Sequence, residues 1–147
     1  METKKITNFF AALLFVGLTS NYALALPSKD EALAACSSLV KKSRLDPVID
    51  SLYGEQLAQV AMKDCITTIG ESNGDPKKAK EVSKRLKSEF GRSMWALIGS
   101  PYVSQTEKSM AVNMEDWHAR MMNNSAIIAG DYGELALEAR KGRQGNN

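Results

Sequence analysis

Several side chains that can bind metals or partner proteins lie close together, in the stretch MAVNMEDWHARMM from Met110 to Met122. This stretch holds four of the chain's seven methionines, its only histidine and one of its two tryptophans. Residues four apart form one slowly drifting line on a helix. Thioether sulfur and imidazole nitrogen suit soft ions such as Cu(I) and Ag(I). One hypothesis is therefore a soft-metal site with the ligands Met110, Met114, His118 and Met122.

The same stretch also fits an amphipathic helix that uses methionine for packing. Apolar side chains recur at i, i+4, i+7 and i+11, which is typical of a face in a core or against a partner. Methionine fills irregular gaps and recurs on adaptable binding surfaces. On this interpretation Trp117 and Met121 point inward, whereas His118 and Met122 lie at the boundary of the buried face. The stripe consists of Met110, Met114, Trp117 and Met121.

Two further aromatic residues are candidates for contact with a partner. Trp95 is a candidate anchor because tryptophan is favoured at the centre of interfaces. Tyr102 follows a Gly-Ser-Pro loop, and aromatic residues on loops often carry function. The predicted partner-binding residues are therefore Met110, Met114, Trp117, Met121, Tyr102 and Trp95.

Catalytic and cofactor motifs are missing from the sequence. There is no GxSxG elbow, HExxH motif or P-loop, and without CxxCH no haem can be attached covalently. Glu115 and Asp116 are adjacent, so on a helix they point in different directions and form no acid–base pair. We predict a protein without a cofactor that is not an enzyme. A hydrolase whose fold brings two carboxylates together is the alternative.

The start of the chain predicts export. Lys4 and Lys5 precede an apolar run from Phe9 to Leu18, and Ala23-Leu24-Ala25 fits the small-x-small cleavage pattern. The run is too short for a bilayer, which needs about 20 residues. We therefore expect a cleaved signal peptide over 1–25. Residues 26–147 then form a single periplasmic or secreted domain with no transmembrane segment and a frayed basic tail from about 142.

The charge balance bears on the partner. The formal net charge is +2 for the whole chain, and removing Glu2, Lys4 and Lys5 leaves about +1. This balance argues against nucleic acid or an anionic membrane as the main partner, because both call for a basic patch. The expected partner is another protein. The sequence leaves open whether the chain also forms a homo-oligomer.

The two cysteines, Cys36 and Cys65, predict one disulfide in an exported protein. In a straight antiparallel helix pair the two positions would be about 11 residues out of register, or roughly 16 Å at 1.5 Å per residue. A disulfide needs Cα atoms within about 7 Å. We therefore predict a helix break near Gly54, which would let the chain run back beside Cys36.

Helix start signals recur along the chain, and no strand-like alternation is present. Capping boxes begin at Ser28 and Ser104, and Asp-Pro pairs begin at Asp46 and Asp75. Gly70 is an expected helix end. Asn123-Asn124-Ser125 is expected to end or fray a helix, and Asp131 to cap a last short one. These signals predict an all-α bundle of four to six helices.

The predicted function is binding of another protein by a small exported helical domain. In a bacterial periplasm such a protein could be an inhibitor or immunity protein, or an accessory to envelope assembly. The alternatives are a Cu(I)- or Ag(I)-binding protein and a carboxylate-dependent hydrolase.

Overall fold

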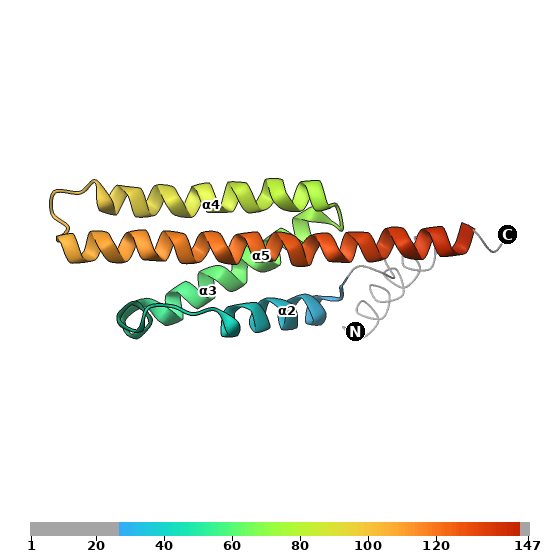
Figure 1. Cartoon of the computed structure of the whole chain (residues 1–147), viewed down its shortest axis with the longest axis horizontal. Coiled ribbons are helices and arrows are strands. Elements are labelled where there is room, and N and C mark those ends of the chain that lie inside the picture. Colours follow the sequence, from blue (N-terminus) through green and yellow to red (C-terminus); the bar gives the residue numbers. More distant parts are fainter. Residues whose placement is uncertain (1–26, 145–147) are drawn as a thin grey trace, which may run out of the picture.

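The structure is a computed structural model that describes residues 27–144, apart from the side chains of 134–140 and 142–144. This range forms four helices and contains no strand, which confirms the all-α bundle (Figure 1). None of the helices in it is long and apolar enough to cross a membrane. The predicted signal peptide and the end of the basic tail lie outside it. The helices are α2 (Lys29–Lys42), α3 (Pro47–Ser72), α4 (Pro76–Ile98) and α5 (Gln105–Gln144).

The longest helix, α5, is the centre of the bundle. Helix α4 runs antiparallel along it, and α2 lies on the other side of α5 in the view of Figure 1. Helix α3 passes behind α5 at an angle and reaches α4 only near the turn that joins them. As a result α3 and α4 diverge toward the end of the molecule that holds the α4–α5 loop.

Local capping fixes the helix starts as predicted. Ser28 and Glu31 form a capping box at α2, and Ser104 and Glu107 exchange the same pair of hydrogen bonds before α5. The Asp46 side chain accepts hydrogen bonds from the backbone N–H groups of Val48 and Ile49. Such contacts satisfy N–H groups that have no partner within the helix.

The Cys36–Cys65 disulfide is present, with 5.8 Å between the Cα atoms, but the predicted break near Gly54 is wrong. Helix α3 is continuous from Pro47 to Ser72. Residues 43–46 have no regular structure and begin with an extended residue, Ser43. Four residues can span up to about 13 Å, which is enough to take up most of the roughly 16 Å mismatch. The first turns of α3 also appear nearly end-on in Figure 1, so its axis bends there without an interruption.

Two predicted helix ends are also wrong. Gly70 does not end α3, which continues to Ser72 and stops before Asn73 in the left-handed conformation at φ 49°. Residues 123–125 do not interrupt α5, which runs on through Asp131 to Gln144. Ser125 is buried, and its hydroxyl donates to the carbonyl of Met121 within the helix. Packing on both sides of α5 therefore outweighs the local tendency of Asn and Ser to leave a helix.

Candidate functional site

The methionine-rich stretch lies in the core for most of its length. Met114, Trp117 and Met121 are buried, as predicted for the inward face. The prediction that His118 and Met122 lie at the boundary is wrong, because their side chains are 1% and 0% exposed. Helix α5 is covered by α4 on one side and by α2 and α3 on another, so its buried face is wider than a single stripe.

His118 joins three helices inside the bundle. Its Nε2 lies 2.9 Å from Oδ2 of Asp64 on α3. Its ring stacks on Phe90 of α4 with centroids 4.1 Å apart and planes 12° from parallel. The only histidine of the chain is thus held by a carboxylate and an aromatic face. This environment gives His118 a structural role in the core.

The geometry separates the four proposed soft-metal ligands. Met110 and Met122 are twelve residues apart on the continuous helix α5, which corresponds to about 18 Å. One ion cannot bind both, and the Nε2 atom of His118 already contacts Asp64. Among the side chains that the structure describes, no three from His, Cys, Asp or Glu lie together as they would around a metal ion.

An apolar groove opens at the end where α3 and α4 diverge. It has a volume of about 290 Å³, with walls from α3 and α4 and a third side from the start of α5. Phe90 and Met114 connect the groove to the core, since both pack in the same apolar cluster as Trp117. The groove is lined by Tyr53, Gln56, Leu57, Val60, Phe90, Met94, Leu97, Val103, Glu107, Met110 and Met114.

Glu107 is the one charged residue that lines this groove. Hydrogen bonds from the hydroxyl and the backbone N–H of Ser104 lower the pKa of the Glu107 carboxyl from its ordinary value of 4.5. Its carboxylate is therefore negative at neutral pH. Asp50 and Glu55 are exposed on the same half of α3, and no basic residue lies between Pro47 and Val60. The lining of the groove is therefore apolar except for Gln56 and the negative Glu107.

The predicted partner-binding residues do not share one surface. Met110 and Met114 line the groove, whereas Trp117 and Met121 lie in the core. Trp95 is exposed on α4, where its indole Nε1 donates to Glu115 at 3.3 Å. Tyr102 is 95% exposed in the α4–α5 loop.

Sequence reasoning missed most of the groove. A signal was present in α3, whose first half carries more apolar residues than one core-facing stripe can hold. A helix that is apolar around its circumference is normally buried on several sides. The residues that were missed are Tyr53, Gln56, Leu57, Val60, Phe90, Met94, Leu97, Val103 and Glu107.

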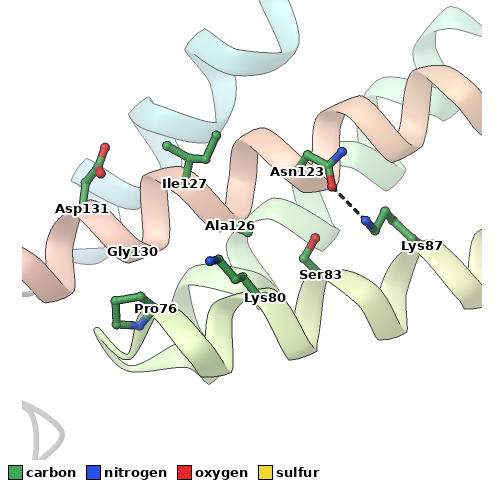
Figure 2. Close-up of a pocket in the computed structure, with 9 residues that line it drawn as sticks. All are labelled: Pro76, Lys80, Ser83, Lys87, Asn123, Ala126, Ile127, Gly130 and Asp131. Carbon is green, nitrogen blue, oxygen red and sulfur yellow. Dashed lines mark hydrogen bonds between the residues drawn. The ribbon is translucent and has the colours of Figure 1, made fainter.

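A second, more polar groove runs along the seam between α4 and α5 (Figure 2). Its Lys87 donates a hydrogen bond to Asn123 at 2.8 Å. The buried Ser83 hydroxyl donates to the carbonyl of Met122 across the seam. Small residues on the α5 side, Ala126 and Gly130, leave room for this groove.

The described residues form a small disulfide-linked helical bundle with an apolar groove at one end and a more polar groove along the α4–α5 seam. Comparison of the chain with protein-family models, curated proteins and solved structures gives no match.

Proposed function

We propose that this protein is exported and binds another protein, by taking an amphipathic helix with basic residues into the groove between α3, α4 and α5. The observation that carries this proposal is the apolar groove itself. Helix-in-groove recognition needs a hydrophobic channel between helices, which an apolar stripe on the incoming helix fills. A disulfide supports export, since such bonds persist mainly in oxidising compartments.

Exposed apolar side chains around the groove support the same proposal. Tyr53 and Val60 are exposed on the side of α3 that lines the groove, and Leu97 is exposed on the α4 side of it. A cluster of exposed large apolar residues around one opening is typical of an interaction surface.

The charges favour a basic partner over a second copy of this chain. Glu107 lines the groove, and Asp50 is exposed on α3, three residues before the groove-lining Tyr53. A two-fold contact through this surface would bring acidic residues of both copies together, and like charges at an interface are unfavourable. A helix with Lys or Arg beside its apolar stripe would pair with Glu107. An inhibitor, an immunity protein or an envelope-assembly accessory could work in this way.

Recovery of the native complex from the envelope tests this function. A tagged chain should co-purify with a stoichiometric companion, and Val60→Asp should release that companion because it places a charge in the groove. Ala34→Asp is the matched control, since Ala34 is exposed on α2 away from the groove. Recovery of a free monomer alone, or equal loss of the companion in both variants, would contradict the proposal.

A further inference from the structure

The charge of the chain is strongly segregated among its helices. Helix α4 carries seven Lys and Arg residues against two Glu, a net charge of +5, whereas residues 26–147 together carry about +1. Of these seven cations, Arg85 alone forms ion pairs with described acidic side chains, namely Glu71 and Glu89. The near-neutral total therefore conceals a basic helix.

Four of the lysines share one face of α4. Their spacing of three, four and three residues matches the helical repeat, so they form a stripe along the axis. Glu81 borders this stripe, four residues after Lys77 and three before Lys84. Lys80 and Lys87 line the seam with α5, where Figure 2 shows both side chains between the two helices. The stripe consists of Lys77, Lys80, Lys84 and Lys87.

Exposed apolar side chains accompany the lysines on this face. Ile127 is 60% exposed and lines the seam from the α5 side. Trp95 is 61% exposed and lines a second hollow, which also includes Lys87 and therefore continues the seam toward the α4–α5 loop. Glu115 and Asp131 are the acidic residues that line these two hollows.

We infer that the face formed by α4 and α5 binds an anionic lipid surface. Lysines combined with exposed tryptophan and aliphatic side chains are typical of helices that lie on a membrane. Helices α4 and α5 run side by side here, so the face extends along the bundle (Figure 1). This site lies on the surface of α4 away from α3 and does not depend on the apolar groove.

A lipid surface explains more of the face than a soluble polyanion does. Four lysines could bind any anionic polymer. A soluble polyanion, however, offers no apolar phase that would bury the exposed Ile127. Single-stranded nucleic acid is bound by several aromatic residues along a basic groove, whereas Trp95 is the one aromatic residue that lines these hollows. Each lysine near an anionic membrane is worth about 1 kcal/mol, or roughly a fivefold gain in partition.

Vesicle sedimentation with the protein purified in its exported form tests the inference. The protein should bind vesicles of phosphatidylglycerol and phosphatidylcholine, but not vesicles of phosphatidylcholine alone. Lys80→Gln with Lys87→Gln should weaken binding about 25-fold, which is two factors of five. Binding should also fall in about 1 M salt, where the Debye length is roughly 3 Å.

The control is Lys41→Gln with Lys42→Gln, which removes the same charge from exposed positions on α2. This variant should bind nearly as the wild type does, and circular dichroism should show both variants folded. Equal binding to the two kinds of vesicle, no binding, or equal losses in the two variants would overturn the inference. Binding of heparin or an oligonucleotide without any vesicle binding would also overturn it and identify a soluble polyanion.

Discussion

Phe90 stacks on His118 at 4.1 Å while it also lines the apolar groove, so the core and the groove share one side chain. His118 is in turn fixed by Asp64 on α3. The wall of the proposed binding site therefore depends on a buried polar contact between two helices. The integrity of this contact should determine how well the groove is formed.

The Asp64–His118 pair should stabilise the fold measurably. Asp64→Ala leaves the buried imidazole without its partner, and an unsatisfied buried polar group costs about 1–3 kcal/mol. In the background of His118→Phe, which keeps an aromatic ring against Phe90, the same substitution should cost much less. Urea unfolding of the four proteins measures the coupling. Equal losses in both backgrounds would show that the pair contributes nothing specific.

Removal of the disulfide should lower stability without changing the fold. The bond links residues separated by 29 positions, and the chain-entropy relation gives about 3–4 kcal/mol for such a loop. Cys36→Ser with Cys65→Ser should lower the free energy of unfolding by that amount while the far-ultraviolet spectrum is kept. A change below about 1 kcal/mol would contradict this expectation.

Two glycines should respond in opposite ways to alanine. A Cβ atom on Gly133 would overlap the carbonyl oxygen of Gly74 in the turn between α3 and α4. Gly133→Ala should therefore destabilise the protein by about 1–3 kcal/mol. Gly70 has open space around it within α3, so Gly70→Ala should stabilise the protein by about 0.5–1 kcal/mol. Denaturant midpoints compare the two, and destabilisation of the same size in both would contradict the close contact.

The cap of α5 should weaken in acid. Because Ser104 lowers the pKa of Glu107 in the folded protein, this contribution is present above the ordinary pKa of 4.5. It is lost as the pH falls through the lower, folded value. Ser104→Ala should raise the Glu107 pKa toward 4.5, which NMR titration of the carboxyl carbon measures. An unchanged pKa in this variant would refute the role of Ser104.

The sequence predicted the starts of the four described helices because each depends on contacts within a few residues, as at Ser104, but the start predicted at Asp131 is wrong because α5 continues through it. The predictions of where helices end, at Gly70 and Asn123, are wrong because tertiary packing decides whether a helix continues past such residues. The predicted break at Gly54 is wrong for a related reason. The prediction did not allow for the distance that the linker between α2 and α3 can span. Summed charge also concealed the basic face of α4, which appears only when charges are assigned to helices.

The candidate site was harder to predict than the fold. Met110 and Met114 were correctly selected from their spacing, but spacing alone did not show that Trp117 faces the core and Met110 the groove. That distinction depends on the angle at which α3 crosses α5. The surplus of apolar residues in the first half of α3 was the one sequence feature that indicated the groove. The α4 residues that form its other wall can be identified only from the packing of the helices.

Site-specific photo-crosslinking tests the proposed function most directly. A photoreactive residue at Tyr53 lies in the groove, and one at Ser38 is exposed on α2 as a control. In the native envelope, position 53 should crosslink to one helical peptide with apolar residues at i, i+3 and i+4 and a neighbouring Lys or Arg. Glu107→Gln, which keeps the cap, should reduce that product. No product, equal products from both positions, or crosslinks to a second copy of this chain would contradict the proposed function.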